Sequence, residues 1–148
     1  MTSMHPRVGV GVIILNEDGN ILVLRRIGSH APYYSIPGGA LKMGETFEQG
    51  AIRELKEECG IVLKDPKVIA ITNNLGTYAQ EGVHFISVIL LVKKFEGVPT
   101  LRETHKHSEL LWVDPKHLPE PHFEASKVGV DCFLARTFYD EPTVSQVD

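Results

Sequence analysis

Short runs of β-branched and aliphatic residues alternate with polar segments along most of the chain, a pattern that predicts β-strands. Residues 8–15 and 21–24 are two such runs, and the polar segment 16–20 between them predicts a hairpin turn. Four more strands are predicted further along, at residues 33–36, 67–72, 84–94 and 110–113. The segment 73–82 is interpreted as a loop between two of these strands.

Two segments have helical spacing instead. Thr46, with Gln49 three positions later, fits a capping box, and Gly60 fits the left-handed residue that follows a helix end. The residues between them therefore predict a helix. Residues 125–139 carry apolar positions one turn apart and predict a second helix, after a helical turn at 114–118.

This order of elements predicts an α/β fold. Strands before and after one helix, with another helix at the end, indicate a mixed sheet that is covered on both faces. A chain of 148 residues is long enough for one domain with a substantial core. We expect a single domain over 1–148, with its core at about 7–139 and a polar, disordered tail at 141–148.

The first predicted helix carries three acidic residues on one face. Glu54, Glu57 and Glu58 lie at offsets of zero, three and four, which places them together on a helix. Like charges at this spacing destabilise a helix by about 0.2–0.5 kcal/mol per pair. Lys56 points away from them, whereas Arg53 lies next to Glu57. A solvated acidic surface is one interpretation, and a hard divalent cation that offsets the repulsion is the other.

The segment before this helix favours the cation. The paired glycines Gly38 and Gly39 let the backbone approach a ligand closely. They begin a longer pattern with fixed spacing, which consists of Gly39, Glu45, Arg53-Glu54-Leu55, Glu57-Glu58 and Gly60-Ile61. This pattern matches the Nudix box at every defined position, so the chain resembles the Nudix hydrolase family, over roughly residues 7–139.

The resemblance implies a Nudix-type α/β/α sandwich in which the box forms a loop-helix-loop. It also implies an enzyme that hydrolyses a phosphoanhydride bond with the help of Mg²⁺ or Mn²⁺. By position, the metal ligands would be Glu54, Glu57 and Glu58, together with the carbonyl of Gly38. Carboxylate and carbonyl oxygens are the donors that these ions prefer.

Other box residues take roles by the same resemblance. Arg53 resembles the cation that orients the carboxylates, and Gly39 lies where the substrate phosphates would approach. Glu45 resembles an anchor behind the metal ligands, with a favourable acid near the helix N-terminus as the alternative.

The residue that removes the proton from the attacking water is left open. Members of the family use either a glutamate of the box or one from a later loop. We favour Glu57 or Glu54, and keep Glu109 and Glu103 as the loop candidates.

Several residues outside the box are further candidates. Arg25 and Arg26 end a predicted strand, and arginine binds phosphate through paired hydrogen bonds. A role as surface residues is the alternative for both. Aromatic residues that could stack on a base, although the core is the favoured place for them, are Tyr33, Tyr34, Phe85 and Phe123. Histidines without metal-ligand spacing, expected at the surface, are His30, His105, His107 and His122.

The substrate class rests on resemblance alone. The compact chain is similar to the MutT-like branch, which implies cleavage of a nucleoside triphosphate, including modified or noncanonical ones, to a monophosphate and pyrophosphate. The segment 101–111 departs from that branch, which leaves the base open. The alternatives are a hydrolase of a nucleoside diphosphate conjugate, such as ADP-ribose, a nucleotide sugar or NADH, and a silent nucleotide-binding module.

Composition narrows the partners and the compartment. The net charge of −4 argues against general affinity for nucleic-acid polymers. Two cysteines form no disulfide framework, so we expect reduced thiols and a cytoplasmic location. The longest apolar stretch, 83–92, is too short to span a bilayer. As an edge strand, it could pair two subunits in a homodimer.

Overall fold

The central strand of the molecule is apolar on both faces, and the rest of the fold is built around it. The structure is a computed structural model that describes residues 5–142. Its elements, in chain order, are β1 Arg7–Ile14, β2 Ile21–Arg26, β3 Tyr34–Ser35, β4 Gly38–Ala40, α1 Phe47–Cys59, β5 Val62–Lys64, β6 Lys67–Asn73, α2 Leu75–Glu81, β7 Phe85–Val92, β8 Lys94–Glu96, β9 His107–Val113 and α3 Glu124–Ala135.

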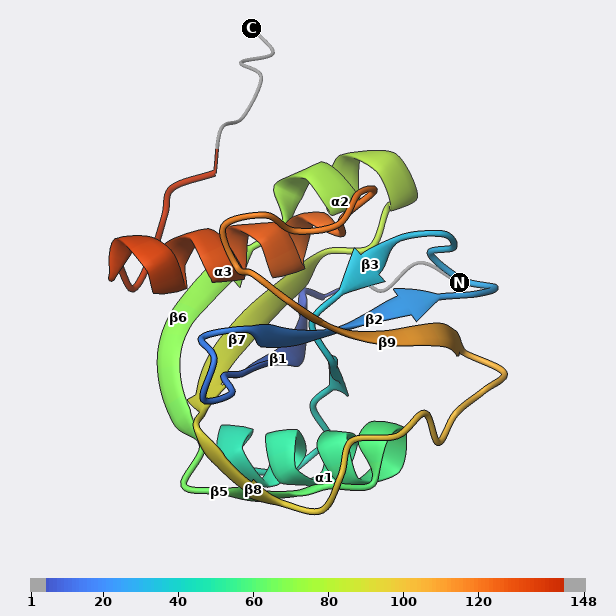
Figure 1. Cartoon of the computed structure of the whole chain (residues 1–148). Helices are drawn as coiled ribbons and strands as arrows, with labels where there is room; N and C mark the ends of the chain where they lie inside the picture. Colours follow the sequence, from blue (N-terminus) through green and yellow to red (C-terminus); the bar gives the residue numbers. More distant parts are fainter. Residues whose placement is uncertain (1–4, 143–148) are drawn as a thin grey trace, which may run out of the picture.

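The main sheet is mixed, as the sequence predicts. It has four strands in the order β4-β1-β7-β6, in which β1 and β7 are parallel and the other pairs are antiparallel. A second sheet has the order β3-β2-β9, and β5 pairs with β8. Figure 1 shows the strands between α1 on one side and the pair α2 and α3 on the other. This arrangement confirms the predicted α/β/α sandwich.

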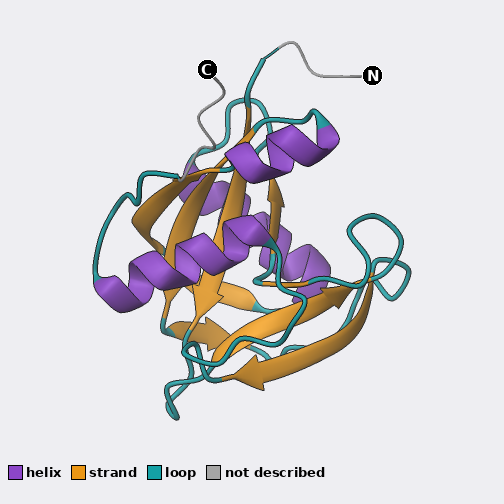
Figure 2. Cartoon of the chain, turned by 90° about the horizontal axis from the view of Figure 1, so that it is seen from above, coloured by secondary structure: helices purple, strands orange, loops and turns teal. Residues whose placement is uncertain are grey.

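The alternation of side chains along β1 connects the two sides. Val10 and Val12 belong to a buried cluster that includes Leu55 of α1. Ile13 belongs to a second buried cluster, which includes Val130 of α3. Successive residues of a strand point to opposite faces, so one strand supplies both halves of the core. Figure 2 shows α3 lying along the strands that it covers.

The helix α1 begins and ends where the sequence predicts. The Thr46 side chain accepts the Gln49 N–H at 3.0 Å, and the Gln49 side chain accepts the Thr46 N–H at 2.9 Å, which completes the capping box. Gly60 has a φ of 70°, and its N–H donates to the Lys56 carbonyl. Leu55 is fully buried, so the predicted apolar face does meet the core.

The predicted hairpin is wrong in its pairing, although its turn is present. The Asn16 side chain accepts N–H groups from Asp18 and Asn20, which stabilises the turn. Beyond a bridge between Leu15 and Ile21, however, β1 and β2 belong to different sheets. β1 pairs with β4 and β7, and β2 pairs with β3 and β9. These long-range pairings decide the topology against the local signal.

The predicted loop 73–82 contains the short helix α2. Asn74 is its N-cap residue, and Gly82 ends it with a φ of 73°. Thr77 is the one buried residue of this helix. With so little of its surface buried, α2 leaves no apolar stripe in the sequence, which is why the pattern indicates a loop.

The prediction of a free edge strand at 83–92 is also wrong. β7 lies inside the main sheet, paired with β1 on one side and β6 on the other. Its backbone is therefore not available to pair a second subunit, and a homodimer stays a prediction without this strand. Of the predicted tail, residues 143–148 lie outside the described part of the chain.

Candidate functional site

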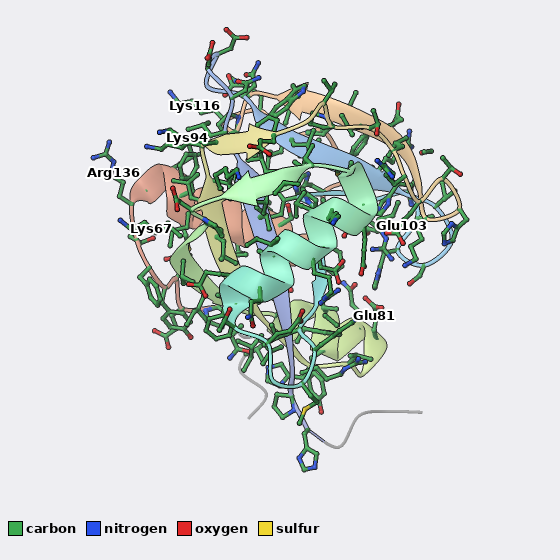
Figure 3. All side chains as sticks on the ribbon, turned by 90° about the horizontal axis from the view of Figure 1, so that it is seen from below. Lys67, Glu81, Lys94, Glu103, Lys116 and Arg136 are labelled. Atoms are coloured by element: carbon green, nitrogen blue, oxygen red, sulfur yellow. The ribbon has the colours of Figure 1, made fainter. Side chains whose placement is uncertain are left out.

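A cavity of about 420 Å³ opens between the glycine strand β4, α1, α2 and the start of α3. Its lining includes Glu58 of α1 and the backbone of Gly38 and Gly39, and it extends to Asn74 and Phe123. Figure 3 looks onto α1 and labels Glu103 beside one end of this helix and Glu81 on α2. The Nudix-like box thus forms one part of the cavity wall, and segments distant in sequence form the rest.

The two glycines of the box permit a close contact between β4 and α1. A Cβ atom at Gly39 would lie 2.5 Å from the Glu54 carboxylate, and one at Gly38 would collide with the Val10 carbonyl. A larger residue at Gly39 would therefore displace the Glu54 carboxylate, and one at Gly38 would push β4 away from β1. The Gly38 N–H also donates a hydrogen bond to Glu58 Oε1 at 3.3 Å.

Glu58 is a buried acid without a charged partner. Its exposed fraction is 4%, and burial, followed by the nearby Glu54 carboxylate, raises its pKa well above the usual value. Within residues 5–142, the one basic side chain within 4.0 Å is His107, through Nε2. Burial lowers the His107 pKa to about 4, so this imidazole is neutral at pH 7. A buried carboxyl in such surroundings either keeps its proton, as the raised pKa indicates, or gives it up to a cation that offsets the charge.

Arg53 holds two other acidic residues of the box. It donates to both Glu45 carboxylate oxygens, at 2.7 and 2.9 Å, and to Glu54 Oε1 at 2.8 Å. The Arg53 hydrogen bonds lower the Glu45 pKa to about 2, and those bonds in turn raise the Arg53 pKa. The bidentate geometry fixes Arg53, which in turn fixes the orientation of Glu54.

Glu57 has a different environment from its two neighbours. Its side chain is 49% exposed and lies 3.6 Å from Arg53, and it is not part of the cavity lining. Within the described residues, no three His, Cys, Asp or Glu side chains form a ready set of metal ligands. Glu54 is also outside the cavity lining, but its carboxylate lies beside Glu58 and against Gly39, so Glu54 and Glu58 are the two neighbouring carboxylates at the glycine strand.

Such a pair suits Mg²⁺ or Mn²⁺. Mg²⁺ is usually held by one or two carboxylates, with water and substrate phosphate completing its shell. The unpaired Glu58 carboxyl beside Glu54 therefore fits a hard divalent cation.

The structure distinguishes the two candidate arginines. Arg26 lines the cavity and donates to the Ser29 carbonyl. Arg25 instead lies over the Tyr34 ring and donates to Glu109 at 3.3 Å, outside the cavity lining.

The structure also separates the two glutamates that were candidates for a loop position: Glu103 lies on a loop, whereas Glu109 lies within β9. The hydrogen bond from Tyr34, followed by Arg25, lowers the Glu109 pKa, and none of these three residues lines the cavity. Glu103 is close enough to Glu58 for its charge to contribute to the raised Glu58 pKa. The Arg102 N–H donates to the Glu58 carbonyl, which ties this loop to the end of α1.

The sequence did not point to three polar residues of the cavity. His107 was expected at the surface, but it is 5% exposed, and its Nδ1 atom has no hydrogen-bond partner within residues 5–142. Asn74 and Ser87 also line the cavity. All three lie in segments whose burial depends on distant strands, so no local pattern marks them. Of the four aromatic candidates, Phe85 and Phe123 are in the lining.

Comparisons with known proteins agree with this geometry. The family model of the NUDIX domain matches residues 5–131. The ADP-ribose pyrophosphatase of Methanocaldococcus jannaschii is 30% identical over 132 residues, which cover 86% of this chain and 73% of the relative. The RNA pyrophosphohydrolase of Sodalis glossinidius is 44% identical over 68 residues. That match covers 46% of this chain, and the chain spans only 38% of that relative's length.

The fold itself has solved counterparts. The crystal structure of a MutT NUDIX hydrolase from Burkholderia pseudomallei superposes with a TM-score of 0.80 at 30% identity. The match covers 86% of this chain and 97% of that one.

The α/β/α sandwich, with two acidic helix residues facing a glycine strand, is shared with the MutT NUDIX hydrolase to which the chain is similar. The chain belongs to the NUDIX family. No helix in the described part of the chain is long and apolar enough to cross a membrane.

Proposed function

We propose that this protein hydrolyses a nucleoside triphosphate to a monophosphate and pyrophosphate, and that it requires Mg²⁺ or Mn²⁺. The observation that carries the proposal is Glu58, a buried carboxylate that faces a cavity large enough for a nucleotide and has no cationic side chain to pair with. The match to a MutT NUDIX hydrolase along nearly its whole length supports the triphosphate as substrate.

The box residues would hold the cation as follows. Glu54, Glu57 and Glu58 would supply carboxylate oxygens from α1, and the Gly38 carbonyl would complete the protein ligands. A bound divalent ion stabilises negative charge on phosphate oxygens and lowers the pKa of a bound water. Arg53 keeps Glu54 in place through the hydrogen bonds described above.

Phosphate binding falls to groups of the cavity wall. Arg26 presents its guanidinium to the cavity, and a guanidinium binds phosphate oxygens in pairs. The glycine backbone at Gly39 allows a phosphate to approach without meeting a side chain. Arg25 donates to Glu109 and lies over the Tyr34 ring. We therefore assign it to this contact between strands and not to phosphate binding.

For the proton of the attacking water, we retain Glu57 or Glu54 as the base and Glu103 as the loop candidate. Glu103 lies beside the box helix, whereas Glu109 is occupied by Tyr34 and Arg25. Glu103→Gln is expected to lower kcat at least about a hundredfold only if Glu103 is the base. A change of less than about threefold would leave the role to the box glutamates.

A nucleoside diphosphate conjugate is the second candidate substrate. It is favoured by the relative named ADP-ribose pyrophosphatase, which aligns over most of this chain. Relatives named RNA pyrophosphohydrolase align over less than half of it.

Product analysis separates the candidates. The purified protein is incubated with Mg²⁺ and either a panel of nucleoside triphosphates or ADP-ribose, and the products are resolved by chromatography. Pyrophosphate with a nucleoside monophosphate supports the proposal, whereas two monophosphates from ADP-ribose support the alternative. No turnover of any nucleotide or conjugate, including nucleotide sugars and NADH, with Mg²⁺ or Mn²⁺ would favour a nucleotide-binding module.

A further inference from the structure

A line of hydrogen-bonded polar side chains lies in the cavity wall at a distance from the box. Ser87 of β7 pairs across the sheet with Gly9 of β1, and Gly9 pairs with Ala40 of β4. Ser87 is therefore two strands away from the glycine strand, or about 10 Å at the usual spacing between strands. This separation places Ser87 beyond the groups that would hold phosphates and metal.

The orientation of Asn74, next to Ser87, is fixed from behind. The Thr72 hydroxyl donates to Asn74 Oδ1 at 2.8 Å, and Asn74 Nδ2 donates to Ser87 Oγ at 3.0 Å. Thr72 is 1% exposed and Asn74 3% exposed. In this arrangement the Asn74 oxygen accepts from Thr72, and the Asn74 nitrogen faces Ser87.

This arrangement leaves hydrogen-bond donors for a ligand. Ser87 Oγ accepts the Asn74 N–H, so its own proton points elsewhere. Asn74 Nδ2 carries a second N–H as well. Within the described residues, neither hydrogen is donated to a protein acceptor. Both residues line the cavity, so a bound molecule that offers an acceptor would satisfy two donors at once.

Aromatic side chains accompany this pair of donors. Phe85 and Phe123 line the same cavity. The Arg7 guanidinium lies over the Phe85 ring at 5.2 Å, and His30 contacts the Phe123 ring at 5.0 Å between centroids. Aromatic faces beside a few fixed polar groups are the usual composition of a site for a flat heterocycle.

We infer that Asn74 and Ser87 form the base-recognition site and donate hydrogen bonds to a ring carbonyl, which selects keto bases such as hypoxanthine, guanine and uracil over amino bases. This inference rests on the proposed nucleotide substrate. An exocyclic amino group is itself a donor, so an adenine or cytosine amine at this point leaves two partly buried donors without acceptors. Loss of such pairing lowers affinity steeply.

The test compares ITP with ATP, which differ in the 6-carbonyl and the 6-amino group. We expect kcat/KM for ITP to exceed that for ATP by about 10- to 100-fold. We expect this difference to arise from a lower KM for ITP and not from a higher kcat. Dissociation constants of IMP and AMP, measured by calorimetry in EDTA, are expected to show the same preference without any turnover.

Four variants make the assignment specific. Ser87→Ala removes one donor and is expected to reduce the ITP preference at least about fivefold. Thr72→Val frees the Asn74 amide to turn and reduces the preference without touching the ligand, whereas Thr72→Ser restores it. Ser35→Ala is the matched control. Ser35 lines the same cavity, but its hydroxyl already donates to the Ile36 carbonyl at 2.9 Å, so the ratio is expected to stay unchanged.

Each outcome either supports or overturns the inferred base preference. Equal dissociation constants for IMP and AMP in the wild-type protein overturn the inference, as does a preference that survives Ser87→Ala and Thr72→Val. If neither ITP nor ATP releases pyrophosphate, the proposed function fails, and the binding constants still decide the base preference.

Discussion

Two neighbouring glutamates of the box are expected to respond in opposite ways to the same substitution. Glu58 is 4% exposed and has no charged partner, whereas the Glu57 side chain is 49% exposed. Removing a buried, unpaired charge while keeping the shape of the side chain stabilises a fold by about 1–3 kcal/mol. Glu58→Gln should therefore make the metal-free protein more stable.

The size of the effect can be converted into a melting temperature. For a chain of this length, each kcal/mol shifts Tm by about 2–4 °C, so Glu58→Gln is expected to raise Tm by about 2–12 °C in EDTA. Glu57→Gln loses a solvated i,i+4 pair with Arg53, which contributes about 0.3–0.5 kcal/mol, and is expected to change Tm by at most about 2 °C.

The assay is thermal unfolding at pH 8 in EDTA and again in Mg²⁺, together with turnover. A ligand at a hundred times its Kd stabilises the fold by about 2.7 kcal/mol, so Mg²⁺ should raise the Tm of the wild-type protein. Both variants are expected to lose most of this gain and most of the activity, Glu57→Gln while keeping a stable fold. If Glu58→Gln lowers Tm in EDTA, the hydrogen bond from Gly38 outweighs the cost of burial and the reasoning is wrong. Wild-type turnover of Glu57→Gln at saturating Mg²⁺ would remove Glu57 from the site.

Three further predictions follow from single contacts. Leu55→Ala empties a fully buried position and is expected to cost about 2–5 kcal/mol in urea unfolding; a cost below about 1 kcal/mol would contradict the packing. Gly39→Ala places a methyl group 2.5 Å from the Glu54 carboxylate and is expected to weaken Mn²⁺ binding, measured by calorimetry, at least tenfold, whereas unchanged affinity would show that the contact is dispensable. Burial lowers the His122 pKa from 6.5. The Ser126 hydroxyl forms a hydrogen bond of 2.7 Å with Nε2 of the neutral His122 ring. Stability from this site is present above pH 6.5 and is lost as pH falls below it; His122→Gln should flatten that part of the urea midpoint profile.

The box helix could be predicted from the sequence because everything that forms it is local. Thr46, Gln49 and Gly60 lie at its ends, and the acidic face follows from spacing along one helix. The pairing of β1 could not be predicted. Its partners β4 and β7 are far apart in the chain, and the turn at 16–20 favours the nearer strand β2. Local propensity selects the elements, and long-range burial decides which strands meet.

The residues of the candidate site also fall into two groups, those that a local motif marks and those that only long-range packing places. Glu54 and Glu58 come from one helix, so a motif of fixed spacing marks them. His107 looks like a surface residue among polar neighbours, but it is 5% exposed, and its Nε2 atom lies 4.0 Å from Glu58 of the box helix. His107 becomes buried only when the sheets assemble, so the pattern of hydrophobic residues in its own segment does not predict its burial.

The difference between residues marked by a local motif and residues placed by long-range packing limits what a Nudix box can reveal about any one chain. The reacting phosphates need charged groups at fixed spacing, and one helix with a preceding glycine strand supplies them. In the base site that we infer, the base meets groups about two strands away, which come from the ends of β6 and β7 and from the segment before α3. These segments pack against each other but share no motif, so they can change independently while the box stays constant. A chain can therefore keep the reaction and exchange the substrate by altering residues such as Asn74 and Ser87, which is why the comparison of ITP with ATP tests more than the motif can predict.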